Sequence, residues 1–201
     1  MKYDRIIAID PGLEGGIVVL VNGELRCKKM PVNIILRKKD GKLVLTKNKK
    51  PSYRKETDIL AVKQILQEQS HLCNPLLLIE KLMIFDKADS DQEAPGKKYR
   101  IQMMLANYEA LKTLIIIAGI PMVEVAPISW QSYLNLRRKG QDRNDRKALF
   151  VEMAGRYFPE MKSNLWNSDA ACIAEFGRRK LAHDPRWIQE RVKYSPNNQL
   201  I

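Results

Sequence analysis

Three acidic residues, far apart in the sequence, each stand where a predicted element begins or ends. Asp10 closes the apolar run RIIAID at residues 5–10, and Glu80 closes the run LLLIE at residues 76–80. Asp169 falls in the first turn of a helix predicted late in the chain. Side chains at neighbouring strand ends meet at one edge of a sheet. We therefore expect these three carboxylates to lie together.

Such a group of carboxylates would bind a hard divalent cation. Carboxylate oxygens without histidine or cysteine favour Mg²⁺, with Mn²⁺ as a substitute, over Zn²⁺. Two such ions can activate a water on one side of a phosphodiester and stabilise the leaving oxygen on the other. The predicted catalytic and metal-binding residues of a nuclease are therefore Asp10, Glu80 and Asp169, with Asp10 as the bridge between ions.

Each acid also has an ordinary interpretation. An Asp before Pro-Gly commonly forms a turn, and a Glu at the end of a strand is commonly solvated. An Asp in the first turn of a helix stabilises that helix electrostatically. The functional interpretation depends on the three acids occurring together.

The hydrophobic pattern predicts the elements that would position these acids. Asn22-Gly23 between two apolar runs is a strong hairpin signal, and a continuous apolar run is typical of a central strand. The predicted strands cover residues 5–10, 17–21, 24–30, 75–80 and 121–125, and the predicted helices cover residues 58–70, 101–118, 148–158 and 169–182, with a short helix around Trp130. This order favours an α/β fold, a mixed five-stranded sheet flanked by helices on both faces.

The chain is expected to form a single domain over residues 1–182. A basic insertion at 37–55 would contain a small hairpin around Asp40-Gly41. Residues 85–100 are predicted to be a loop, and the tail 183–201 is predicted to be irregular. The sequence contains neither a GxxxxGK[ST] loop nor a GxGxxG motif after the first strand, so the usual nucleotide-binding loops are excluded.

The net charge of +12 favours a polyanionic partner. The insertion is the first candidate DNA-binding element, although a solvated hairpin would have the same composition. A second basic cluster precedes the helix that leads towards Asp169. The candidate phosphate contacts are Lys38, Lys39, Lys47, Lys49, Lys50 and Arg54 in the insertion, and Arg137, Arg138, Lys139, Arg143, Arg146 and Lys147 in the second cluster.

The three cysteines, Cys27, Cys73 and Cys172, are odd in number and form no CxxC pair. A disulfide framework and a zinc ribbon are therefore not indicated. The start of the chain does not have the pattern of a signal peptide, and no apolar stretch reaches the length needed to span a bilayer. We expect an intracellular, reducing location without a membrane partner, cytoplasmic or nucleoid-associated in a bacterium or phage.

Four segments, in the right order over about residues 5–180, resemble the RuvC-like Holliday-junction resolvases. They are IIAIDPGLEGGIVVL, LLLIE, GIPMVEVAPISWQSYL and SDAACIAEFGRR. The resemblance implies an RNase H-like fold, Mg²⁺, a homodimer and cleavage of four-way DNA junctions. It also implies that Phe85, which follows the second acid, is a base-stacking wedge, although an ordinary core position is an equal alternative.

The sequence departs from this family near the last acid. The family has a fourth acid or a histidine three residues before it, where this chain has Trp166. Asn167 is the remaining candidate for a fourth ligand. A family lysine is replaced near Trp130, and Lys147 or Arg146 is expected to supply a phosphate contact. The long insertion indicates a divergent member, viral, organellar or phage-borne.

Three further expectations complete the interpretation. The helix at 101–118 is apolar on more than one face, which favours burial within one subunit or between two, and a twofold dimer would match a four-way junction. A strand ending in Asp-x-Gly also opens sugar kinases and actin-like ATPases, but those proteins need two such domains. A catalytically impaired RNase H-like module that only binds DNA stays as the alternative.

Overall fold

The computed structural model describes residues 3–46, 48–70, 74–83, 97–138 and 140–193. Five strands form one sheet in the order β3-β2-β1-β8-β9. β2 is antiparallel to β1 and β3, whereas β8 is parallel to both β1 and β9. The strands of this sheet are β1 (Arg5–Ile9), β2 (Gly16–Val21), β3 (Glu24–Lys29), β8 (Pro75–Glu80) and β9 (Met122–Val125). This order and these directions confirm the predicted mixed five-stranded sheet of the RNase H-like fold.

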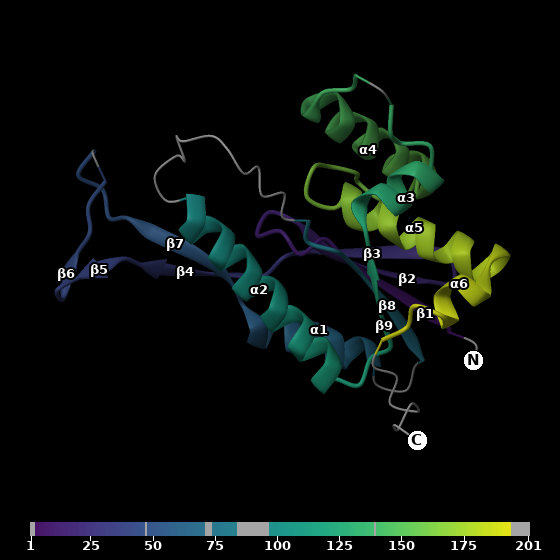
Figure 1. Ribbon diagram of the computed structural model, residues 1–201, viewed down its shortest axis with the longest axis horizontal. Helices are drawn as coiled ribbons and strands as arrows, with labels where there is room; N and C mark the ends of the chain where they lie inside the picture. The colour runs from purple at the N-terminus through teal and green to yellow at the C-terminus, as the bar shows by residue number, and fades with distance from the viewer. Residues whose placement is uncertain (1–2, 47, 71–73, 84–96, 139, 194–201) are drawn as a thin grey trace.

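Helices cover both faces of the sheet, as Figure 1 shows. Alternate residues of a strand point to opposite faces, and each face of this sheet has its own core. Even-numbered residues of β1 and β8 pack with the later helices, and odd-numbered residues pack with the first two. One face carries α1 (Ile59–Ser70) and α2 (Lys97–Ile117); the other carries α3 (Pro127–Tyr133), α4 (Arg143–Tyr157), α5 (Ser168–His183) and α6 (Pro185–Gln189).

The helix α5 lies very close to the sheet, and Gly177 makes this approach possible. A Cβ added at Gly177 would lie 2.9 Å from Cδ1 of Leu78 on β8. Ten consecutive residues of α5, from Ser168 to Gly177, are buried. The sheet therefore fixes the position of the helix that carries Asp169.

A two-stranded ribbon extends away from the sheet, with α2 beside it (Figure 1). It consists of β4 (Val32–Leu36) and β7 (Tyr53–Thr57), antiparallel with Leu36 opposite Tyr53. The small hairpin of β5 (Lys38–Lys39) and β6 (Lys42–Leu43) continues it, with Asp40 and Gly41 both at positive φ. This hairpin was predicted, but β4 and β7 were not. We call residues 32–46 and 48–57 the arm.

Two predictions about helices are wrong. The segment 85–100 was predicted to be a loop, but α2 already begins at Lys97. The tail was predicted to be irregular, but residues 185–189 form α6. Asp184 accepts a hydrogen bond from the backbone N–H of Trp187 and Pro185 occupies the first turn, which is a typical helix start.

The cysteines of the described residues form no disulfide, because Cys27 and Cys172 are both free. Cys73 lies outside the described residues. In the described part of the chain, every helix is too short or too polar to cross a lipid bilayer.

Candidate active site

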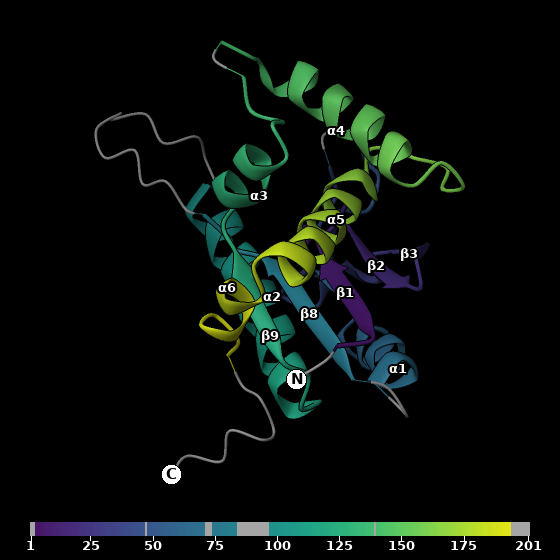
Figure 2. The ribbon, with the colours of Figure 1, turned by 90° about the vertical axis from the view of Figure 1, so that its right-hand side faces the viewer.

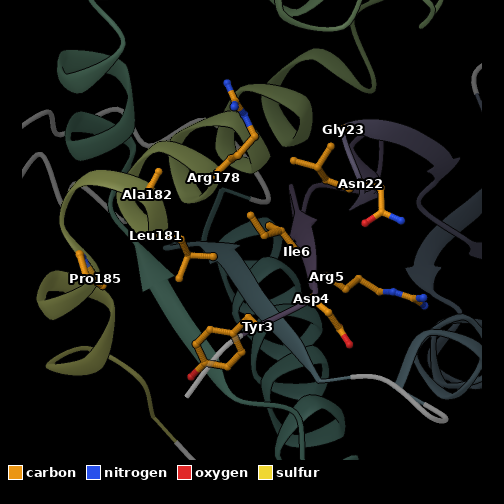
Figure 3. A pocket seen from close by; sticks show the side chains of 11 residues that line it. Tyr3, Asp4, Arg5, Ile6, Asn22, Gly23, Arg178, Leu181, Ala182 and Pro185 are labelled. Atoms are coloured by element: carbon orange, nitrogen blue, oxygen red, sulfur yellow. The ribbon is translucent and has the colours of Figure 1, made fainter.

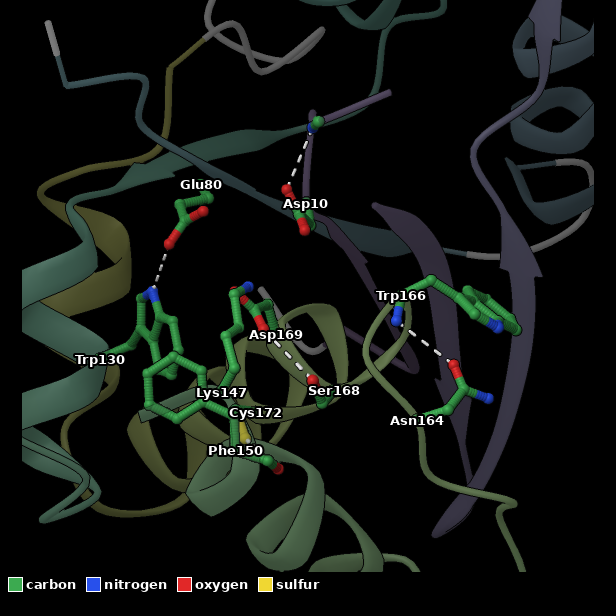
Figure 4. A network of polar contacts seen from close by, with 11 residues as sticks. Asp10, Glu80, Trp130, Lys147, Phe150, Asn164, Trp166, Ser168, Asp169 and Cys172 are labelled. Carbon is green, nitrogen blue, oxygen red and sulfur yellow. Dashed lines mark hydrogen bonds and ion pairs between the residues drawn. The ribbon is translucent and has the colours of Figure 1, made fainter. Parts of the chain in front are cut away.

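The sheet register brings Asp10 and Glu80 together. Ile9 of β1 lies opposite Ile79 of β8 in a parallel pair, so the residues that follow them, Asp10 and Glu80, lie at the same level along the two strands. Both have even numbers, which directs their side chains to the face that α5 covers. Asp169 stands in the first turn of α5. Figure 4 shows the three carboxylates gathered at this edge of the sheet.

Burial and mutual repulsion make the ionised forms of these acids costly. Burial raises the pKa of Glu80 to about 8, and the charges of Asp10 and Asp169 contribute to the increase. Burial also raises the pKa of Asp10, and the charge of Asp169 adds to this effect. Carboxylates that share a buried site favour a nearby cation.

One ammonium group lies among these carboxylates. The Lys147 Nζ atom of α4 is 2.5 Å from Oδ2 of Asp169. The hydroxyl of Ser168 donates a hydrogen bond to the other oxygen of Asp169, at 3.2 Å. Lys147 was predicted as a phosphate contact, and the structure places it beside Asp169.

Glu80 is held by a tryptophan. The indole N–H of Trp130 donates a hydrogen bond of 3.0 Å to Oε1 of Glu80. Trp130 is fully buried and packs on Phe150, with ring centroids 4.9 Å apart. The Trp130 bond was not predicted, because it joins α3 to β8 across the fold and has no local sequence signal.

The loop after β1 packs directly against Asp10. The backbone N–H of Gly12 donates a hydrogen bond of 3.0 Å to Oδ1 of Asp10. A Cβ added at Gly15 would lie 2.6 Å from Cγ of Asp10, so a larger residue would displace that side chain. The glycines of this loop therefore set the position of the carboxylate.

The donor atoms of this site fit a hard divalent cation. Three carboxylates share one ammonium, and oxygen donors are those that Mg²⁺ and Mn²⁺ prefer. As the side chains stand, the described residues contain no group of three acidic, histidine or cysteine side chains arranged to hold an ion. Asp169 is bonded to Lys147 and Glu80 to Trp130, so cation binding would require these side chains to adjust.

The candidate fourth ligand, Asn167, has other partners in this structure. Its Oδ1 accepts a hydrogen bond from the backbone N–H of Asn164, and its Nδ2 donates one to the carbonyl of Lys162. Its side chain makes no capping hydrogen bond to α5. The indole of Trp166 lies against Gly16, on the side away from the carboxylates (Figure 4). Both residues therefore shape the loop that leads into α5.

Two clefts meet at Asp10. The larger has a volume of about 840 Å³ and extends from Asp10 and Glu80 to the arm and α2. The other, of about 690 Å³, is bordered by Glu14, Lys147 and Leu165. Asp10, Gly12 and Arg143 line both clefts, so Asp10 stands where the two clefts join, and Glu80 lines the larger one.

Another cavity, of about 570 Å³, lies where β1 begins (Figure 3). Its only acidic lining residue is Asp4, whose carboxylate accepts hydrogen bonds from the backbone N–H of Asn74. This cavity therefore lacks the group of carboxylates found at the other end of β1.

The structure separates the basic residues that were predicted to bind DNA. Arg54 and Arg143 line the larger cleft, and so does Arg37, the first residue of the predicted basic insertion. Arg138 lies in a separate hollow with Asp145 and Glu152. The remaining exposed residues are Lys38, Lys39, Lys49 and Lys50 on the arm and Arg137 after α3, while Arg146 on α4 is partly buried. Lys47, Phe85 and Lys139 lie outside the described residues.

Comparison with known proteins gives structural similarity only. The structure of T. thermophilus RuvC in complex with a Holliday junction substrate matches 90% of this chain and 96% of its own, with 13% identity and a TM-score of 0.49. A second Thermus thermophilus RuvC structure matches 94% and 98%, with 13% identity and a TM-score of 0.46. No family model and no curated protein sequence matches. The fold assignment rests on the strand order and directions given above.

Proposed function

We propose that this protein is a Mg²⁺-dependent endonuclease that cuts branched DNA. The observation that carries this proposal is the group formed by Asp10, Glu80 and Asp169 around the ammonium of Lys147, with Asp10 at the junction of two clefts. The larger cleft that contains Asp10 and Glu80 is also lined by Arg37, Arg54, Arg100 and Arg143. A site that gathers negative charge inside a basic cleft fits a cation and a phosphodiester bound together.

The residues of the site have separate tasks in this reaction. Asp10, Glu80 and Asp169 would hold the cation, which when bound activates water and stabilises charge on the scissile phosphate. The Trp130 N–H orients Glu80. Lys147, once it leaves Asp169, donates a hydrogen bond to a phosphate oxygen, and Arg143 neutralises charge on the same strand.

The preference for four-way junctions and the homodimer follow from the sequence resemblance. A twofold dimer would place two active sites for symmetric nicks. In support of a dimer, α2 exposes Met104, Leu105 and Ile117, with Ile117 76% exposed. Sedimentation of the protein at micromolar concentration should give a species of twice 23.2 kDa. A monomer alone would contradict the dimer.

Labelled four-way, flap and linear DNA, incubated with Mg²⁺, Mn²⁺ or a chelator, test the activity. The protein should cut the junction only when the metal is present, and Asp10→Asn should bind it without cutting. Asp4→Asn is the matched control, because Asp4 precedes the same strand at the opposite end. Binding without cleavage by the wild-type protein would contradict the nuclease and favour a DNA-binding module.

A further inference from the structure

The arm and the start of α2 form one wall of the larger cleft. Arg37 follows β4, Arg54 lies on β7, and Tyr99 and Arg100 lie near the start of α2; all four line this cleft. Figure 1 shows α2 running beside β7. Residues far apart in the sequence therefore meet on a surface that continues from Asp10 and Glu80.

The side chain of Tyr99 contacts two guanidinium groups, one over its ring and one at its hydroxyl. The guanidinium carbon of Arg37 is 5.6 Å from the centre of the Tyr99 ring. The Nη1 atom of Arg54 is 3.5 Å from the Tyr99 hydroxyl. Tyr99 is nevertheless 40% exposed, so part of its ring is open to a ligand. Arginine and an aromatic ring in contact are a frequent platform for nucleic-acid bases.

Positive charge exceeds negative charge on this wall. Arg54 forms an ion pair with Glu56, at 2.8 Å. Among the described residues, Glu56 is the one acid that forms an ion pair with Arg37, Arg54 or Arg100. Within the described residues, the guanidinium groups of Arg37 and Arg100 form no ion pair. Guanidinium groups match the geometry of phosphate oxygens.

Apolar side chains lie next to these charges. Met103 and Met104 of α2 and Met83 after β8 line the same cleft, and Met104 is 51% exposed. Methionine adapts its shape to flat and irregular ligands. A cationic group beside an aromatic and apolar surface has the chemistry of a nucleotide site, with a phosphate at one end and a base at the other.

The wall is held in place at the base of the arm. The amide oxygen of Asn107 accepts a hydrogen bond of 3.1 Å from the backbone N–H of Thr57. The amide nitrogen of Asn107 donates one of 2.9 Å to the carbonyl of Met103. One side chain therefore joins β7, which carries Arg54, to α2, which carries Tyr99.

We propose that Arg37, Arg54 and Tyr99 form a subsite for one unpaired nucleotide of the DNA strand bound in the cleft. The base lies against Tyr99 and the methionines, and its phosphate contacts the arginines. This inference rests on the proposed function, because the strand in the subsite continues to the carboxylates. The subsite would favour DNA that supplies an unpaired nucleotide close to the cut.

Binding of a twelve-residue oligothymidylate in chelator tests the subsite without catalysis. Tyr99→Ala should weaken binding roughly fivefold or more, since stacking of one base contributes about 1–3 kcal/mol. Tyr99→Phe keeps the ring and should stay within about twofold of wild type. Arg37→Gln should reduce the salt dependence of binding by about 0.7 in the log–log slope. Arg54→Gln should reduce it by less, because Glu56 already pairs with Arg54. Arg156→Gln is the matched control, because Arg156 is exposed on α4 and lines neither cleft.

A 2-aminopurine placed in the oligonucleotide reports stacking directly. Wild type and Tyr99→Phe should quench its fluorescence, and Tyr99→Ala should restore it while circular dichroism remains that of the folded protein. Unchanged affinity and quenching in folded Tyr99→Ala would overturn the subsite, as would equal weakening by Arg156→Gln. The protein could instead bind a blunt duplex more tightly than the single strand, with no effect of Tyr99→Ala. That result would overturn the subsite and indicate that this wall binds the backbone of duplex DNA.

The two proposals fail differently. If Tyr99→Ala cuts junctions and binds single strands like wild type, the subsite is wrong and the nuclease stands. If wild type cuts no DNA with Mg²⁺ but Tyr99 still controls single-strand binding, the nuclease is wrong and the subsite stands as a binding site.

Discussion

At the scale of single residues, the charges of Lys147 and Asp10 should have opposite effects on the stability of the metal-free protein. Three carboxylates stand at this edge, and Lys147 neutralises one of them at 2.5 Å. Replacing Asp10 with its neutral isostere removes a charge that burial and Asp169 both disfavour, whereas its Oδ1 can still accept the Gly12 hydrogen bond. Removing Lys147 leaves Asp169, which is 6% exposed, without its ion-pair partner.

We therefore expect thermal unfolding in chelator to change in both directions. Asp10→Asn should raise the free energy of unfolding by about 1 kcal/mol, which is about 2–4 °C in Tm for a chain of this length. Lys147→Gln should lower it by about 1–3 kcal/mol. Mg²⁺ should stabilise wild type but not Asp10→Asn. A lower Tm for Asp10→Asn in chelator would show that repulsion among the acids is not what limits stability.

At the scale of elements, the close contact of α5 with the sheet depends on the absence of a side chain at Gly177. Gly177 faces Leu78 so closely that an added Cβ would lie 2.9 Å away, whereas a Cβ at Gly155 in α4 would meet Ser163 at an ordinary 3.6 Å. Both glycines are inside helices, where alanine is intrinsically better by about 1 kcal/mol. Substituting each glycine by alanine therefore separates the effect of helix propensity on stability from the effect of packing.

Gly177→Ala should destabilise the protein by about 1–3 kcal/mol through overpacking, despite the gain in propensity. Gly155→Ala should be neutral or stabilise it by up to about 1 kcal/mol. Urea unfolding of both variants measures the difference. Because α5 carries Asp169, Gly177→Ala should also reduce Mg²⁺-dependent cleavage. Equal free energies of unfolding in the two variants would contradict the close packing of α5.

The strand β9 is tied to α2 and to the end of the described chain by Glu124. The Tyr108 hydroxyl donates a hydrogen bond to it at 2.8 Å, and the ammonium groups of Lys112 and Lys193 lie at 3.3 and 2.5 Å. Burial alone would raise the pKa of Glu124, but the hydrogen bonds from Lys193 and Tyr108 and the charge of Lys112 lower it to about 2.

The pKa of Glu124 in the folded protein is below the ordinary value of 4.5. The bonds to ionised Glu124 therefore contribute fully to stability above pH 4.5. This contribution is lost as the pH falls towards 2. Between pH 6 and pH 3, wild type should therefore lose about 1–3 kcal/mol more of its free energy of unfolding than Glu124→Gln. Glu109→Gln, at an exposed partner of Lys112, should behave like wild type. A parallel loss in wild type and Glu124→Gln would contradict the assigned role of these bonds.

At the scale of the whole molecule, the sheet and its acidic edge could be predicted because their signals are local. β1, β2 and β8 consist mainly of continuous apolar runs, β9 is a short strand interrupted by Glu124, and Asn22-Gly23 identifies one hairpin. The arm could not be predicted, because β7 has the polar sequence YRKET and pairs with a strand about twenty residues earlier. The positions of Arg37, Tyr99 and Trp130 near the carboxylates could not be predicted either, because they depend on how the arm, α2 and α3 pack against the sheet.

The distribution of charge over the molecule gives the last prediction. The arm extends from the body and carries exposed lysines, so it would meet DNA at a distance from the carboxylates (Figure 1). Changing Lys38, Lys49 and Lys50 together to glutamine should lower the log–log salt slope of duplex binding by about 2–3, since each lost phosphate contact reduces it by about 0.9.

A second triple variant distinguishes position from net charge. Lys63, Arg156 and Lys162 are exposed on other parts of the molecule, and changing them to glutamine removes the same three of twelve net positive charges. If the arm contacts the backbone, only the first variant flattens the slope, because counterion release depends on phosphates contacted rather than on total charge. Equal slopes for the two variants would mean that the arm binds DNA no better than the rest of the surface.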